Sequence, residues 1–256
     1  MKSMFSRILA IIAGVMLISS PTVRAGGTDD RIESAAAKSY VFKTYLKDDS
    51  INTESKDGVV TLSGTVSEES HKSLAENTVA GLPGVKSVNN ELKISGEQPA
   101  KHSDAWITMK VKTALLFHRN VSGSGTTVHT KDGIVTLQGV ASSIAQKELT
   151  TEYAKDIDHV KEVKNFMSIA ATPAAPVATP DDKIDDASIT AQVKSSLFSH
   201  RSTSTLHTAV STTDGVVTVS GAANNEAEKS LVTKLATDIN GVVSVVNNMT
   251  VTVALN

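Results

Sequence analysis

Residues 57–66 read DGVVTLSGTV, and similar decamers return twice more along this chain of 256 residues. DGIVTLQGVA occupies residues 132–141, and DGVVTVSGAA occupies residues 214–223. Each begins with an Asp-Gly pair, which suits a tight hairpin turn because glycine accepts a positive φ without a Cβ clash. The apolar residues that follow alternate with polar ones, as in a strand with one buried face. The decamer therefore predicts a hairpin turn and a half-buried strand, present three times.

A second motif follows each decamer at a fixed distance. Starting 27 residues after each aspartate, the chain reads GVKSVNNEL (84–92), HVKEVKNFM (159–167) and GVVSVVNNM (241–249). Identical spacing in three copies is the signature of a repeated structural module. The late motif predicts the last strand of each module, and the repetition reports architecture rather than three active sites.

Amphipathic helices are predicted on both sides of the hairpin. Upstream, apolar residues recur every four positions in copies two and three; they are Ile107, Val111 and Leu115, and Ile189, Val193 and Leu197. Copy one is interpreted as about five residues shorter before its turn. Downstream, Ser143 with Gln146 and Asn225 with Glu228 resemble capping boxes at the start of a second helix.

The predicted order in each copy is αββαβ, an α+β fold. Two strands pair as a hairpin, and the crossover to the third strand makes a small three-stranded mixed sheet with two helices on one face. We place the modules at residues 30–96, 103–170 and 184–254, joined by linkers at 97–102 and 171–183. Three prolines stiffen the second linker, and we expect the third module to move partly independently of the others.

Residues 1–25 have the features of a secretory signal peptide. Lys2 and Arg7 precede an apolar run of eleven residues that is too short to span a bilayer, and Ala25 ends a typical cleavage site. The chain has no cysteine, so disulfides and an acylated N-terminal cysteine are excluded. We expect an exported, periplasmic protein that is cleaved near Ala25 and is not a lipoprotein.

The decamer, the late GVxxVxNxL strand and the αββαβ order together resemble the BON domain, a family named for bacterial osmotically inducible and nodulation proteins. The family's typical second-strand glycine matches Gly64, Gly139 and Gly221. The resemblance covers nearly all of residues 30–254. It implies a non-enzymatic envelope protein associated with osmotic or envelope stress, phospholipid binding or chaperone-like help to exported proteins.

No constellation of residues supports catalysis, a metal or a cofactor. The seven histidines lack HExxH spacing. The aspartates of the three turns are interpreted as turn residues, not catalytic carboxylates, because aspartate before glycine commonly serves local hydrogen bonding. These turn residues are the pairs Asp57 and Gly58, Asp132 and Gly133, and Asp214 and Gly215. We therefore expect a protein that is not an enzyme.

Charge distinguishes the middle module from the other two. Residues 101–170 hold 9 basic and 7 acidic residues and are net positive, whereas residues 26–100 hold 8 and 12, and residues 171–256 hold 5 and 8. The only tryptophan, Trp106, lies on the first helix of the middle module. Tryptophan among lysines suits a membrane interface with anionic lipid. The candidate lipid-binding residues are Trp106, Met109, Lys110, Lys112 and Arg119.

A structural interpretation of the same residues stays open, in which Trp106 covers the module's core and the lysines are solvated.

His118-Arg119 and His200-Arg201 recur at equivalent positions. For these pairs, a favourable interaction with the C-terminus of the first helix is preferred over a headgroup or partner site. The net charge of +2 is too small to indicate nucleic acid.

Two functions follow as expectations: binding of an anionic phospholipid membrane surface, or chaperoning of unfolded exported proteins by three linked modules.

Overall fold

The computed structural model describes residues 26–121, 123, 125–170, 183–203 and 207–252. The predicted signal peptide and almost all of the second linker lie outside the described residues. Within the described residues, no helix is long and apolar enough to cross a membrane.

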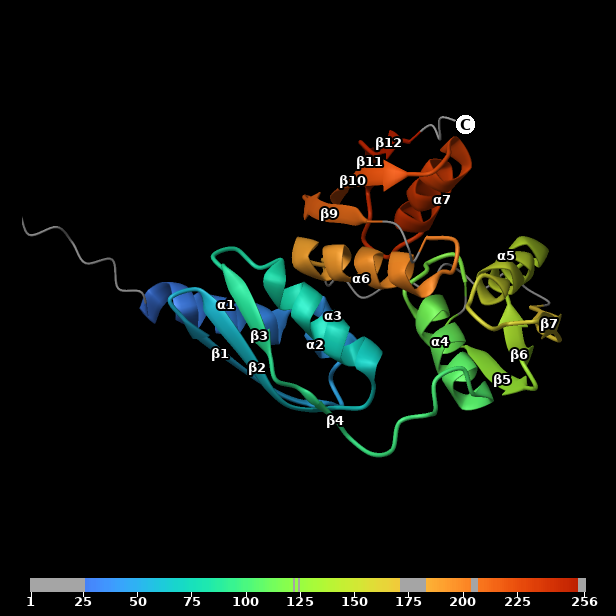
Figure 1. Cartoon of the computed structure of the whole chain (residues 1–256), viewed down its shortest axis with the longest axis horizontal. Helices are drawn as coiled ribbons and strands as arrows, with labels where there is room; N and C mark the ends of the chain where they lie inside the picture. The colour runs from blue at the N-terminus through green and yellow to red at the C-terminus, as the bar shows by residue number, and fades with distance from the viewer. Residues whose placement is uncertain (1–25, 122, 124, 171–182, 204–206, 253–256) are drawn as a thin grey trace, which may run out of the picture.

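Three modules follow one another along the chain (Figure 1). Module 1 consists of α1 (Gly26–Lys38), α2 (Tyr40–Thr44), β1 (Ser50–Lys56), β2 (Val59–Val66), α3 (Glu69–Ala80), β3 (Ser87–Asn90) and β4 (Lys93–Ile94). Module 2 consists of α4 (Asp104–Leu116), β5 (Thr126–Lys131), β6 (Ile134–Ala141), α5 (Ile144–Lys155), β7 (Glu162–Asn165) and β8 (Ser168–Ile169). Module 3 consists of α6 (Asp186–Ser199), β9 (Thr208–Thr213), β10 (Val216–Ala223), α7 (Glu226–Thr237), β11 (Ser244–Asn247) and β12 (Thr250–Val251).

The predicted αββαβ order and the mixed sheets are confirmed. In each module the hairpin strands pair antiparallel, and the last strand pairs parallel with the central one. The last strand is divided into two short segments, both paired with the central strand. In module 1 the first helix is also divided, at Ser39, whose side chain accepts a hydrogen bond from the Phe42 amide and starts α2.

An asparagine explains the division of the last strand. In module 2, Asn165 Oδ1 accepts from the Met167 amide, which bends the chain between β7 and β8. Its Nδ2 donates to the Lys147 carbonyl and to Thr151 of α5, tying the strand to the helix. Asn90 and Asn247 do the same in the other modules. The asparagine of the late motif is thus a structural residue.

The Asp-Gly pairs form the predicted tight turns. Asp132 and Gly133 have φ values of 54° and 79°, and the two other pairs have similar values. The Asp104 carboxylate, in the first turn of α4, accepts from the amides of Gly133 (2.9 Å) and Asp132 (2.7 Å). These hydrogen bonds lower the pKa of Asp104 below its usual range. Hydrogen bonds therefore hold each turn against the first helix of its own module.

The same hydrogen bonds correct the expectation that copy one is about five residues shorter before its turn. Asp29, Asp104 and Asp186 each bind a turn that begins 28 residues later. Copy one is therefore not five residues shorter before its turn. The apolar pattern of its first helix is weaker because Ala36 stands where the other copies have valine, and because Ser39 interrupts the helix.

Both proposed capping boxes are present. Ser143 accepts from the Gln146 amide, and the Gln146 side chain accepts from the Ser142 amide. Asn225 and Glu228 start α7 in the same way, with Glu228 accepting from the Asn224 amide.

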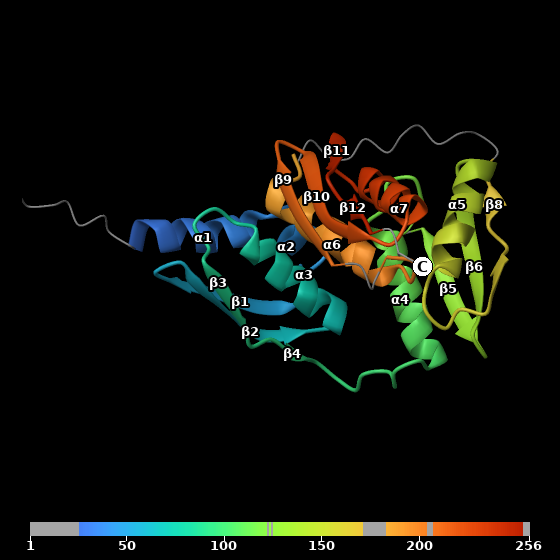
Figure 2. The same ribbon diagram turned by 45° about the horizontal axis from the view of Figure 1, so that its top comes forward.

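Helix α6 joins the three modules. It lies between α3 of module 1 and α4 of module 2 in both views (Figures 1 and 2). Its side chains are buried on nearly every side, and the Asp185 carboxylate at its start accepts from the Tyr40 amide of module 1 (2.8 Å). Ser188 Oγ accepts from the Val41 amide.

The expectation of a partly independent third module is therefore wrong for this structure. The linker composition favoured independence, but the buried face of α6 is made of small and polar residues that carry no strong apolar signal. Such residues allow close helix approach: a Cβ on Gly81 would lie 3.2 Å from the Ala187 side chain.

Candidate functional site

The first helix of module 2 presents two faces at the centre of the molecule. Ile107, Val111 and Leu115 point into the core of the module. Around the same helix, Lys110 reaches Phe198 of module 3, while Met109 and Lys112 line a cavity on the side of module 1. The Ser103 hydroxyl fixes the start of the helix by accepting from the Trp106 amide.

Trp106 is half-buried, and the interpretation in which it covers the core of its module applies to it. Its ring packs against the core of module 2. The ring also lies edge-on to His102, with centroids 5.2 Å apart, and near His159 at 6.2 Å. Trp106 therefore covers the core, while part of the ring stays accessible.

Lys110 bridges two aromatic rings from different modules. Its Nζ lies 5.6 Å from the centroid of Trp106 and 5.3 Å from that of Phe198 on α6. Both distances allow a cation–π interaction. Burial lowers the pKa of Lys110, and the carboxylates of Glu68 and Asp158 oppose this effect. Phe198 is 66% exposed, so a cation and a protruding aromatic ring lie together at the surface.

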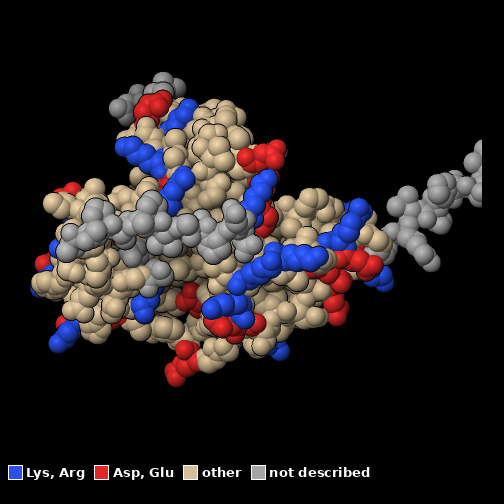
Figure 3. Space-filling model, turned by 180° about the vertical axis from the view of Figure 1, so that it is seen from behind, with Lys and Arg blue, Asp and Glu red and all other residues tan. Residues whose placement is uncertain are grey.

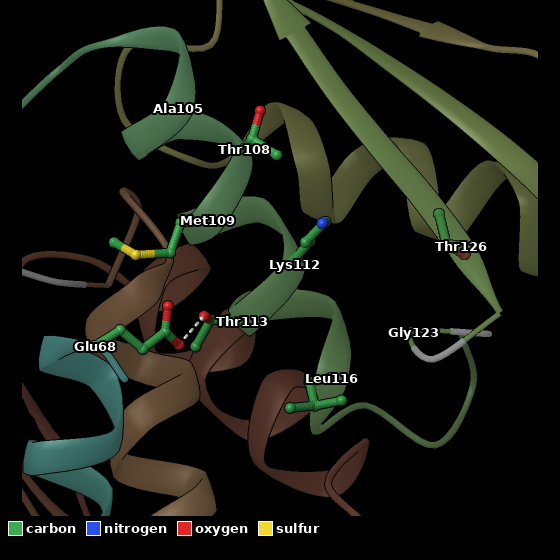
Figure 4. A pocket seen from close by; sticks show the side chains of 9 residues that line it. All are labelled: Glu68, Ala105, Thr108, Met109, Lys112, Thr113, Leu116, Gly123 and Thr126. Atoms are coloured by element: carbon green, nitrogen blue, oxygen red, sulfur yellow. Dashed lines mark hydrogen bonds between the residues drawn. The ribbon is translucent and has the colours of Figure 1, made fainter. Parts of the chain in front are cut away.

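A cavity of about 580 Å³ adjoins this helix (Figure 4). Figure 4 shows Met109 and Lys112 extending from α4, and the hydrogen bond from Thr113 to Glu68 of module 1. The lining residues are Glu68, Ala105, Thr108, Met109, Lys112, Thr113, Leu116, Gly123 and Thr126. The cavity thus combines one amine, one carboxylate, several hydroxyls and apolar side chains.

A second, smaller cavity of about 290 Å³ lies at the equivalent face of module 3. Lys194, Phe198 and Thr208 line it, at the positions that Lys112, Leu116 and Thr126 hold in module 2. Ser73 and Asn77 of α3 complete it. The first helices of modules 2 and 3 therefore present matching cavities, both bordered by module 1.

Arg119 does not belong to this surface. Its guanidinium donates to the carbonyls of Thr237 and Val242 in module 3, and its amide donates to the Asp238 carbonyl. The predicted lipid-binding set is thus divided: Trp106, Met109, Lys110 and Lys112 share one helix and its two adjoining faces, and Arg119 lies in a contact between modules. We call Trp106, Met109, Lys110, Lys112 and Phe198 the α4 surface.

Sequence reasoning missed Phe198 and Glu68. Phe198 stands where Leu116 stands in module 2, and only the packing of α6 beside α4 brings it to Lys110. Glu68 comes from module 1, and no pattern in the sequence links it to α4. Among the described residues, no group of three or more potential ligands could hold a metal ion.

The face of the molecule drawn in Figure 3 shows charges of both signs side by side, without one continuous basic field.

A model of the BON domain matches residues 28–96, 103–171 and 185–253. The chain belongs to the BON-domain family. The α4 surface is thus the first helix of the second BON domain, together with one residue of the third.

Three curated proteins are similar to this BON-domain chain. Osmotically-inducible protein Y of Escherichia coli (strain K12) is 32% identical over 57% of this chain and 71% of its own length. A 21 kDa hemolysin of Actinobacillus pleuropneumoniae is 31% identical over 55% of this chain and 75% of its own length. The outer membrane lipoprotein DolP of Haemophilus influenzae is 31% identical over 52% of this chain and 68% of its own length.

Proposed function

We propose that this BON protein is an exported envelope-stress protein that binds anionic phospholipid at a membrane surface through the α4 surface. The observation that carries the proposal is Lys110 held between Trp106 and the exposed ring of Phe198, with Lys112 in the adjoining cavity. Aromatic rings rest among headgroups, and lysines attract anionic lipid. The names of two relatives, one osmotically inducible and one an outer membrane lipoprotein, support the envelope setting.

Co-sedimentation with vesicles of phosphatidylglycerol and phosphatidylcholine tests this function. The double variant Lys112→Glu/Phe198→Ser reverses one exposed charge and removes the protruding ring, while leaving the cores of both modules unchanged. Each basic residue near an anionic surface contributes about 1 kcal/mol, so a charge reversal and a lost anchor weaken binding by roughly tenfold or more.

The matched control is Lys164→Glu/Val243→Ser, which makes the same charge reversal at an exposed lysine of β7 and replaces an exposed apolar side chain of module 3 by serine. We expect the control to bind like the unaltered protein. Equal losses in both double variants would show that general charge, and not the α4 surface, governs binding.

A second function, binding of unfolded exported proteins, is favoured by a different surface of module 2. Ile144 and Phe166 are 66% and 65% exposed, at positions where module 1 has Glu69 and Glu91. Val140 and Ile169, at the same end of β6 and β8, are exposed as well. These four residues form the β6-end patch. Exposed apolar side chains that the fold does not require indicate an interaction surface.

Aggregation of a urea-unfolded outer-membrane protein, followed by light scattering, tests the second function. The variant Ile144→Glu/Phe166→Glu introduces the residues of module 1 and is expected to abolish suppression of aggregation at equimolar protein. Val243→Glu/Val246→Glu, on module 3, is the control and should retain suppression. Equal suppression by both variants would exclude the β6-end patch as the client site.

A further inference from the structure

Two buried histidines face each other where module 2 meets module 3. His118 follows α4, and His200 caps the C-terminus of α6. Both side chains are withdrawn from solvent, and their Nε2 atoms lie 3.3 Å apart. Ser196 Oγ lies 3.1 Å from the same nitrogen of His118. The contact between the modules is therefore centred on a pair of titratable rings.

The contact repeats itself about a pseudo-twofold axis. His118 Nδ1 lies 3.1 Å from Asp238 Oδ2, and His200 Nδ1 lies 3.4 Å from Asp156 Oδ2. Each aspartate ends the second helix of the other module. Backbone hydrogen bonds follow the same pattern, from Arg119 to the Asp238 carbonyl (2.8 Å) and from Arg201 to the Asp156 carbonyl (2.6 Å). Self-complementary contacts of this kind are usual between identical subunits.

The two carboxylates have other donors besides the histidines. Asp238 accepts from the hydroxyl of Tyr153 (2.7 Å) and from the Asn120 amide group. Asp156 accepts from the amide and hydroxyl of Ser202. Neither histidine Nδ1 is aligned to donate a hydrogen bond, although both lie within ion-pair distance. The carboxylates are thus satisfied without a charged imidazole.

Charged and titratable groups reach the pair from every element that packs against it. They are Tyr153 of α5, Asp156 at its end, Asp238 after α7, Arg119 after α4 and Arg201 after α6. The ring centroids of Tyr153 and His118 lie 4.2 Å apart, so the tyrosine ring covers the imidazole. The Arg119 guanidinium donates to the carbonyls of Thr237 and Val242, and the Arg201 guanidinium donates to the Lys155 carbonyl and lies 4.0 Å from the Asp156 carboxylate.

A neutral imidazole at His118 suits this environment better than a charged one. Burial lowers the pKa of His118; the adjacent Asp238 opposes this effect and His200 adds to it. A histidine whose pKa is lower in the folded state stabilises the fold fully above its unfolded value of about 6.5, and this stability is lost as the pH falls below that value. Two imidazolium rings with facing nitrogens would repel each other strongly in a buried site.

We propose that the contact between modules 2 and 3 opens when the pH falls through the range in which histidine titrates, while each module stays folded. Module 1 has Lys43 and Gly81 at the positions of the histidine and aspartate, so it lacks this device. Its contacts with α6, from the Tyr40 and Val41 amides, involve no histidine. Acid therefore opens the contact between modules 2 and 3 and leaves the contact between modules 1 and 3 in place.

Distance measurement between spin labels tests the proposal on the full chain. The chain contains no cysteine, so Gln138→Cys and Ser220→Cys place labels at equivalent exposed positions of β6 and β10. At pH 8 we expect one narrow distance distribution, and at pH 5 a broad, longer one. The far-UV circular dichroism should stay unchanged. An unchanged distribution at pH 5, or a loss of secondary structure in parallel with the opening, overturns the proposal.

Substitution of the histidines identifies the titrating groups. In the labelled chain, His118→Gln/His200→Gln removes both protonation sites, and the narrow distribution should persist at pH 5. His207→Gln, at an exposed histidine of module 3, is the control and should open like the parent. If the double variant does not dock at pH 8, the single variant His200→Gln provides the test. It lacks the repulsion from a second imidazolium, so the midpoint pH of the opening should fall by about one unit. An unchanged midpoint pH overturns the proposal.

Discussion

At the scale of single residues, the recurrent glycine of the central strand shows how closely the hairpin strands approach. Gly139 has a φ of 137°, and a Cβ at this position would lie 2.3 Å from the Gly125 carbonyl oxygen. Gly64 and Gly221 face the carbonyls of Ser50 and His207 in the same way. The glycine is required by backbone geometry and by the lack of space for a side chain.

Gly139→Ala should therefore destabilise module 2 by about 2 kcal/mol or more, since residues with side chains are strained at this φ and the new methyl group meets backbone. Trp106, the only tryptophan, lies in the same module, so its fluorescence during urea unfolding reports on that module. Gly96→Ala is the control: its φ of 78° is also positive, but no atom lies within 4 Å of the added Cβ. A Trp106 transition that moves equally in both variants would contradict a role for the close approach.

At the scale of elements, the fold could be predicted because each signal is local. The Asp-Gly turn, the alternation after it and the capping residues Ser143 and Asn225 depend only on nearby chain. The hydrogen bonds from the turns to Asp29, Asp104 and Asp186 were not predicted, although each aspartate precedes its turn by the same 28 residues. A lone aspartate at a helix start is ordinarily interpreted as a favourable charge in the first turn, so nothing local indicates a long-range partner.

At the scale of the whole molecule, the candidate site could be predicted only in part. Charge and composition identified the first helix of module 2, and four of the five predicted residues share it. The placement of Arg119 and Phe198 depends on how modules 2 and 3 dock. That docking depends on His118, His200 and the aspartates that face them, and no pattern in the sequence shows that these residues meet.

The docking of module 1 onto module 3 gives a prediction at this scale. Asp185 caps α6 by accepting from the Ser188 amide, and it also accepts from the Tyr40 amide at the start of α2. Asp185→Ala should cost about 1 kcal/mol at the cap and also free the Tyr40 amide. Hydrogen exchange should therefore accelerate in α2 of module 1 as well as in the first turn of α6.

Asn225→Ala is the matched control for this prediction. Asn225 caps α7 by accepting from the Glu228 amide, and its side-chain amide donates to the Glu228 carboxylate in the same module. Removing it should accelerate exchange at the start of α7 and leave α2 unchanged. If Asp185→Ala also leaves α2 unchanged, the hydrogen bond to Tyr40 does not hold the two modules together. If both variants accelerate exchange in α2, any loss of stability in module 3 loosens module 1, and docking depends on the whole buried face of α6.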